Sequence, residues 1–360
     1  MFAKKNLVAV AALLAVAGAA QAQSSVKLYG YLEMDAGSYE GAHAKGTSSR
    51  VTKVQSGDMM TSFIGFAGVE DLGGGLKAEF TLESFLAADT GEAGGPNTRN
   101  KAGGFWSRGS NVALSGGFGK VALGQYDNPL FTSAYTYNPF GSSMSFSPAM
   151  RHLNYVGQTG GIAGAGVGFD TGWVNSVTYE SPVLSGFQGI AQYGAKESTA
   201  SGAKNSYAVA ASYNAGPFSA MLTYVKAGKV PAVSATNDPY TAEEKVTNLG
   251  ASYDFGVLKA FGQYTYIKDT TNTNKDKIWQ LGVSVPVTEK ASVMASFGQL
   301  KDTVTGASAS QKDEVFSLGY NYDLSKRTAV FAAFMNNRQS ASTGNDSAGQ
   351  SYAVGIKHNF

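Results

Sequence analysis

The stretch Val26-Lys27-Leu28-Tyr29-Gly30-Tyr31-Leu32-Glu33-Met34-Asp35 alternates between two kinds of side chain at every step. A period of two places neighbouring side chains on opposite faces of a β-strand, so this stretch predicts a strand with one apolar and one wet face. The same alternation recurs at residues 76–84, 206–214, 218–225, 315–322 and 351–360. None of these stretches has the helical period, which predicts an all-β fold.

The breaks between the predicted strands alternate in length. Short breaks, in which Gly, Pro and Asp supply tight-turn conformations, lie at residues 73–75, 116–118, 184–186, 215–217, 254–256, 287–289 and 324–326. Long polar breaks lie near residues 39–60, 88–106, 127–171, 196–205, 228–243, 268–276, 301–312 and 337–349. These connections require about 16 strands, an even number as in single-chain outer-membrane barrels.

Composition supports a membrane barrel. Residues 1–22 combine Lys4, Lys5, an apolar run and Ala20-Gln21-Ala22, which predicts a cleaved signal peptide and one mature domain over residues 23–360. The mature part then has as many basic as acidic residues, which argues against nucleic-acid binding. The chain has no Cys, only 15% charged residues, and 45 Gly, 19 Tyr and 20 Phe among 360 residues. Export without a spanning helix predicts an antiparallel transmembrane β-barrel with an aqueous lumen, hence a transport function.

Four segments carry a resemblance to a known family: residues 28–30, 68–78 and 119–126, and the terminal Phe360. Together they resemble the general diffusion porins of Gram-negative outer membranes, in the betaproteobacterial branch. The resemblance implies passive diffusion of small hydrophilic solutes and ions, and a homotrimer in contact with lipid and lipopolysaccharide. It also implies that the third long loop, residues 127–171, folds into the barrel, and that the assembly machinery recognises Phe360.

The sequence departs from this family at the expected constriction. Arg108 fits a pore-wall arginine of the family, but Phe63 and Gln125 stand where the family or branch often has Arg. The loop has Asn138-Pro139-Phe140-Gly141 in place of an acidic segment, and Arg151 is its one charged residue between Asn128 and Phe169. The loop is also rich in aromatic residues, Tyr135 and Phe140 among them.

These departures predict a weaker transverse field and a more aromatic constriction. The hypothesis is a mildly anion-preferring pore that accepts aromatic carboxylates, because a carboxylate pairs with Arg and a ring stacks on Tyr or Phe. The alternative is that these aromatics only pack the loop against the wall. The predicted constriction residues are Arg108, Arg151, Phe63, Gln125, Lys77, Glu83, Tyr135 and Phe140. The residues that alternation places on the lumen wall are Lys27, Tyr29, Tyr31, Glu33, Asp35 and Glu79.

Other functions are weaker readings of the sequence. A substrate-preferring channel of the same fold is the nearest alternative. An outer-membrane enzyme would depend on His358, which alternation places on the outer face, together with one of the many Ser residues, but no supporting Asn is identifiable. An adhesive barrel leaves the porin-like segments unexplained. Three scattered histidines and no metal-ligand spacing predict no metal and no cofactor.

Overall fold

The computed structural model describes residues 25–44, 49–94, 104–158, 172–197, 199, 201–228, 244–269, 274–304, 310–341 and 346–360. The predicted signal peptide and the end of the third loop, from residue 159 to residue 171, lie outside the described residues. Within them, 19 strands hydrogen-bond into one sheet and two helices lie between strands β8 and β9.

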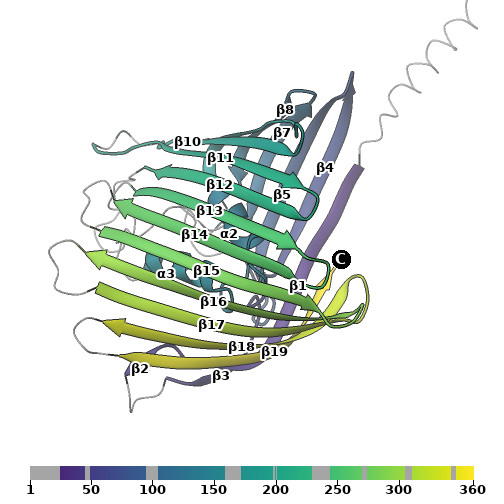
Figure 1. Ribbon diagram of the computed structural model, residues 1–360. Helices are drawn as coiled ribbons and strands as arrows, with labels where there is room; N and C mark the ends of the chain where they lie inside the picture. Colours follow the sequence, from purple (N-terminus) through teal and green to yellow (C-terminus); the bar gives the residue numbers. More distant parts are fainter. Residues whose placement is uncertain are drawn as a thin grey trace, which may run out of the picture.

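The chain forms a closed antiparallel barrel, as the alternating pattern predicted (Figure 1). Its 16 wall strands are β1 Ser25–Tyr39, β4 Phe63–Gly73, β5 Leu76–Ala87, β7 Gly109–Gly116, β8 Gly119–Tyr126, β9 Trp173–Glu180, β10 Phe187–Gly194, β11 Ser206–Ala215, β12 Phe218–Ala227, β13 Glu244–Asp254, β14 Lys259–Asp269, β15 Asn274–Pro286, β16 Ala291–Val304, β17 Ser310–Asp323, β18 Thr328–Ala341 and β19 Ser347–Asn359. Three short strands add to them: β2 His43–Ala44, β3 Val51–Gln55 and β6 Glu92–Ala93.

The first and last strands close the barrel. β1 pairs with β19 from Tyr31↔Asn359 to Ser38↔Tyr352, and with β4 on its other side. The terminal residue extends this ladder, because Phe360 and Gly30 exchange both backbone hydrogen bonds. Closure leaves no strand edge exposed to lipid, which is the condition for a sheet to span a membrane.

The two faces of the wall separate as the alternation predicted. Outward residues are apolar and exposed, such as Leu222 at 54% and Leu249 at 51% of their surface. Their strand neighbours Thr223 and Asn248 point inward and are fully buried. An apolar exposed face suits contact with hydrocarbon, and the polar inner face suits a lumen.

Seven short turns join the wall strands at one rim, and all seven lie at the predicted positions. The strand ends that the long connections join lie at the other rim (Figure 1). Sequence analysis missed β2, β3 and β6, which are too short to show a period. It also missed the helices α2 Pro129–Thr136 and α3 Pro148–Gln158. Neither of these helices, in the described part of the chain, is long and apolar enough to cross a membrane.

Lipid contact on the outer wall predicts a depth-dependent cost of charge. Leu249→Arg places a charge at mid-height of β13 and is expected to lower the free energy of unfolding by about 2–4 kcal/mol. Thr303→Arg, on the outer face near the long-loop end of β16, is expected to cost only about 0–1 kcal/mol. Denaturant unfolding in lipid vesicles measures both values, and equal costs would contradict a lipid-facing wall at β13.

Candidate functional site

The third long loop begins with two short helices whose first residues are fixed by local chemistry. Asn128 caps α2, because its side-chain oxygen accepts a hydrogen bond from Leu130 N at 2.9 Å and Pro129 follows it. Ser147 plays the same part for α3, accepting from Met150 N at 3.3 Å ahead of Pro148. An Asn-Pro or Ser-Pro pair before an apolar run is a helix-start signal, so the sequence did contain this information.

Both helices pack against the inner wall of the barrel (Figure 1). α2 contacts β11, β12 and β13, and α3 contacts β15, β16 and β17. Leu130 and Ala134 of α2 are fully buried in a cluster that includes Val225 and Val246 of the wall. Residues 129–158 of the third loop therefore lie inside the lumen, where burial of their apolar side chains holds them.

Glycines in the wall seat the segment between the two helices. A Cβ on Gly282 would come within 2.6 Å of Pro139 Cδ, and one on Gly250 within 2.3 Å of Tyr137 Cδ2. Asn138 stabilises the turn itself, donating to Ala134 O at 2.7 Å and accepting from Phe140 N at 2.8 Å. This segment approaches the sheet so closely that side chains on the wall would displace it.

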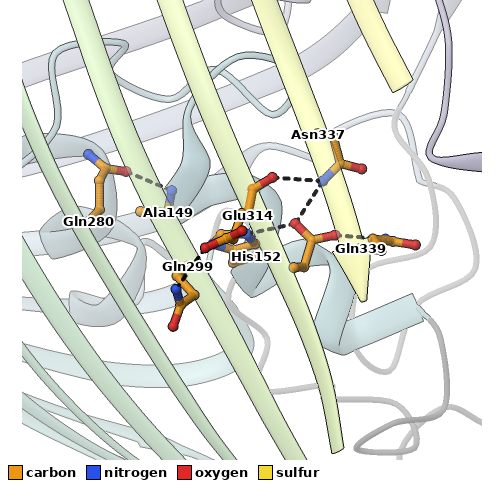
Figure 2. A network of polar contacts seen from close by, with 8 residues as sticks. Ala149, His152, Gln280, Gln299, Glu314, Asn337 and Gln339 are labelled. Atoms are coloured by element: carbon orange, nitrogen blue, oxygen red, sulfur yellow. Dashed lines mark hydrogen bonds and ion pairs between the residues drawn. The ribbon is translucent and has the colours of Figure 1, made fainter. Parts of the chain in front are cut away.

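Polar contacts fix α3 to β15 and β17, and side chains of β18 support the contact to β17 (Figure 2). His152 Nε2 lies 2.9 Å from Asp313 Oδ1, and both side chains are buried. Asn337 and Gln339 donate to the same carboxylate at 2.8 and 2.7 Å. Ala149 N donates to Gln280 Oε1 at 2.7 Å. Because a buried carboxylate needs several donors, these residues hold α3 in one position.

Arg151 belongs to this anchored part of the loop. Burial lowers the pKa of its guanidinium, and the charges of Asp313 and Asp58 act in the opposite direction. Asp58 comes from residues 56–62, an inserted segment between β3 and β4. Ser145 donates to Asp58 Oδ1 at 2.6 Å, and Ser143 donates to its backbone oxygen at 2.5 Å. Arg151 is thus a partly exposed residue of α3 whose positive charge is stabilised by the charges of Asp313 and Asp58.

The inserted segment also covers the inner face of β1. Met59 N donates to Glu33 Oε2 at 2.9 Å, and Ser62 Oγ donates to Glu33 O at 3.2 Å. Glu33 and Asp35 are 0% and 3% exposed, so they do not line open water. The segment fills the space between this wall and the third loop.

A cavity of about 400 Å³ remains between α2 and the opposite wall. Strands β1, β5, β7, β8, β9 and β10 line it on one side, and α2 with the residues before it lines it on the other. Its lining is Tyr29, Thr81, Glu83, Arg108, Gly109, Asn111, Lys120, Gln125, Tyr126, Asp127, Pro129, Thr132, Tyr135, Glu180, Gln188 and Ile190. This lining is mostly polar, with tyrosine rings set among charged groups.

Arg108 is the best-positioned basic group of the cavity. Its Nη1 donates to Glu83 Oε2, and Tyr29 donates to the other oxygen of Glu83 at 2.5 Å. The guanidinium carbon lies 4.1 Å from the centre of the Phe63 ring. Glu83 and Phe63 therefore fix the orientation of Arg108, as a carboxylate and an aromatic face do for a planar guanidinium.

The other charges on the cavity are also held by neighbours. Lys120 Nζ lies 2.8 Å from Glu79 Oε2. Tyr126 donates to Glu180 Oε1 at 2.9 Å. In its lining, Glu83, Asp127 and Glu180 face Arg108 and Lys120. The cavity thus combines both signs of charge at short range.

The structure brings some predicted constriction residues together and separates others. Arg108, Glu83, Gln125 and Tyr135 line the cavity, and Phe63 supports Arg108 from beside it. Phe140 is 2% exposed and packs with Met59 and Phe146 in the wall cluster. Lys77 lies exposed beside the short turn between β4 and β5, and Arg151 lies on α3. Burial raises the pKa of the Tyr135 hydroxyl, which keeps it a neutral donor on the cavity wall.

Three charged residues and one tyrosine of the cavity were not predicted: Lys120, Asp127, Glu180 and Tyr126. Lys120 and Glu180 face each other across β8 and β9, a pairing that depends on a register the sequence does not state. A bulge between Gly124 and Tyr126 breaks the alternation just before the loop, so parity alone misplaces Tyr126 and Asp127. Among the described residues, no three His, Asp or Glu side chains gather as a metal site.

Comparison with known proteins agrees with this architecture. The family model described as Gram-negative porin matches residues 9–342. Outer membrane porin protein 32 of Delftia acidovorans is 35% identical over 294 residues, covering 79% of this chain and 76% of the relative. The anion-selective porin from Comamonas acidovorans superposes with a TM-score of 0.75 at 27% identity, covering 94% of this chain and 100% of that one. The trimer form of OmpT from Vibrio cholerae gives 0.65 at 15% identity, covering 94% and 99%.

Close seating of the loop on wall glycines predicts a specific mutational effect. Gly282→Val adds a side chain where Pro139 now lies, so residues 129–158 are expected to loosen at a cost of about 1–3 kcal/mol. Hydrogen exchange of the backbone amides in α2 and α3 should become faster. Gly262→Val is the matched control, because its Cβ would meet only Leu281 Cδ2, at 3.4 Å. Equal exchange in the two variants would contradict the seating.

Proposed function

The chain belongs to the Gram-negative porin family, and from this premise we propose that the cavity around Arg108 sets which solutes its channel prefers. As a porin, it forms a water-filled channel of the outer membrane through which small hydrophilic solutes and ions diffuse. The finer proposal is a mild preference for anions, aromatic carboxylates among them. The observation that carries it is the oriented Arg108 beside the tyrosines of the cavity.

Arg108 has donors to spare for an entering anion. A guanidinium carries five N–H groups, and within the described residues its one carboxylate partner is Glu83. Glu83 and Phe63 already fix the Arg108 side chain. Little conformational entropy of the protein is therefore lost when a solute carboxylate pairs with Arg108. Tyr29, Tyr126 and Tyr135 on the same cavity offer aromatic faces to the rest of such a solute.

The remaining charges keep this preference small. Three carboxylates and two basic groups share the lining, so the acidic groups oppose the anion preference of Arg108 and no large single-sign field can build up. We expect chloride to be favoured over potassium by about two- to threefold, the ratio that ~0.5 kcal/mol of electrostatic free energy produces. The Comamonas acidovorans porin, which has a similar structure and is 27% identical, is anion-selective, and this supports the same sign.

The proposal includes a homotrimer as the working assembly, supported by the trimer form of the similarly folded OmpT. The pattern of current steps in a planar bilayer tests this assembly. The three identical channels of a trimer insert together and then close in three equal steps. Export through residues 1–22 and recognition of Phe360 during assembly are proposed on the family resemblance.

Reversal potentials under a salt gradient test the selectivity directly. Arg108→Ala removes the fixed positive group and leaves Glu83 without its basic partner, so the channel is expected to turn from mild anion preference to cation preference. Benzoate added to one side should reduce the current of the original protein and have less effect on this variant.

Arg151→Gln is the control for this experiment, since it removes the same charge from a position on α3 outside the cavity lining. It is expected to leave the reversal potential unchanged. A cation-selective original protein, or an equal shift in both variants, would overturn the proposal for Arg108.

A further inference from the structure

Glu33 and Asp35 form a buried pair of carboxyl groups on the inner face of β1. They are two residues apart in the strand, so their side chains share this face, and both are almost fully buried. The two carboxyl groups lie within hydrogen-bonding reach of each other. We call these two residues the carboxyl pair. Two carboxylates so close together in a poorly solvated place do not both ionise easily, because their charges repel.

Protein donors account for two of the four oxygens of the carboxyl pair. Glu33 Oε2 accepts from Met59 N at 2.9 Å and from Met60 N at 3.4 Å. Asp35 Oδ1 accepts from the hydroxyl of Tyr39. The other two oxygens, Glu33 Oε1 and Asp35 Oδ2, are buried without a donor. One proton held between them would give all four oxygens a hydrogen-bond partner, which is the normal condition of buried polar atoms.

Asp313 shows how this barrel stabilises a buried carboxylate without such a proton. Asn337 donates to its Oδ1 and Gln339 to its Oδ2, and the His152 ring lies 2.9 Å away. The carboxyl pair has no comparable set of donors. Among the described residues, no Lys, Arg or His side chain forms an ion pair with either of its members.

The cations nearest to the carboxyl pair are engaged elsewhere as well. Lys357 of β19 stands directly opposite Glu33 in the sheet, and the charge of Asp323 on β17 also acts on it. Lys53 of β3 lies with its Nζ 5.9 Å from the centre of the Tyr39 ring. Neither ammonium group therefore neutralises the pair at close range.

Further acidic groups face the carboxyl pair from two other segments. Asp58 of the inserted segment and Asp89, which follows β5, place negative charge near Asp35. Arg151 of α3 acts on Asp58 from the far side of the inserted segment. Tyr31, the remaining titratable neighbour on β1, feels the charge of Glu33. These surroundings favour a pair that carries one negative charge over a pair that carries two.

The inserted segment connects the carboxyl pair to the third loop. Its residues Met59 and Met60 are hydrogen-bonded to Glu33, as described above. Asp58 is adjacent to Met59, and its side chain accepts from Ser145 of the loop at 2.6 Å. Met59 also packs in the cluster that contains Phe140. A displacement of residues 58–60 therefore reaches residues 140–145, which lie between α2 and α3.

We propose that Glu33 and Asp35 share one proton and that this protonated pair positions the third loop in the lumen. As the pH rises, the pair loses the proton to water, and two facing oxygens become negative with no donor between them. Two buried charges require hydration, and the inserted segment that covers them must move aside to admit water. The positioning is thus present at low pH and lost as the pH rises through the titration of the pair.

Two measurements on the folded full barrel in lipid vesicles test this proposal. Infrared spectroscopy should detect the C=O band of a buried carboxylic acid, and this band should disappear as the pH is raised. Over the same pH range, the hydrogen-exchange protection factors of the Met59 and Met60 amides should fall about tenfold, the change that one pKa unit of linkage produces. Neither readout depends on which solutes the channel prefers.

Two substitutions separate the shared proton from the shape of the side chains. Glu33→Gln supplies a permanent N–H in place of the proton, so it is expected to lose the acid band and to keep the low-pH protection at every pH. Asp35→Asn is expected to do the same from the other side of the pair. Glu33→Ala removes the acceptor of Met59 N and is expected to loosen the inserted segment at every pH.

Glu70→Gln is the matched control, because Glu70 is an exposed carboxyl residue near the short-turn end of β4. It is expected to keep both the acid band and the pH profile of the original protein. A spectrum of the original protein without a buried acid would overturn the proposal. A Glu33→Gln variant that titrates like the original protein would overturn it as well.

Single-channel conductance tests whether the carboxyl pair positions the loop, and this readout alone rests on the channel function proposed above. Conductance is expected to rise with pH in the original protein and in Glu70→Gln, and this rise is expected to be lost in Glu33→Gln. An equal rise in all three proteins, while exchange at Met59 and Met60 still depends on Glu33, would overturn the positioning role.

Discussion

Every backbone N–H and C=O group in the hydrocarbon of a membrane must find a partner within the protein, and the rest of this structure depends on that constraint. The pairing of β1 with β19 satisfies it, because it converts a long sheet into a barrel without edges. The alternation of side chains follows, since each strand then has one face toward lipid and one toward the lumen. Phe360 completes the closing ladder at the last residue of the chain.

A closed barrel of this size would be wide open without the third loop. Contacts with the inner wall stabilise the loop in the lumen. Apolar residues of α2 pack on the wall, and His152 pairs with Asp313. The inserted segment around Asp58 fills the space on the side of β1. Between α2 and the opposite wall, the described residues leave the cavity that holds Arg108. The selectivity we propose is thus a consequence of where the loop is anchored.

The sequence predicted the wall better than the lumen, for a physical reason. Strand positions and turns follow from a local period, and all seven short turns were placed correctly. The site depends on contacts between distant residues. Arg108 was predicted from the family resemblance and Glu83 from its place on a wall strand, but Lys120 and Glu180 meet only through strand register. The sequence alone does not separate the loop aromatics that line the cavity from those that pack against the barrel. Tyr135 lines the cavity, whereas Phe140 packs against the wall.

The central claim is that the inward loop, rather than the barrel wall, limits flow through the channel. Single-channel conductance of a variant in which residues 129–158 are replaced by a short Gly-Ser linker tests this claim most directly. The account predicts a conductance severalfold higher than that of the original protein, because α2 and α3 no longer occupy the lumen. An unchanged conductance in a correctly folded variant would contradict it.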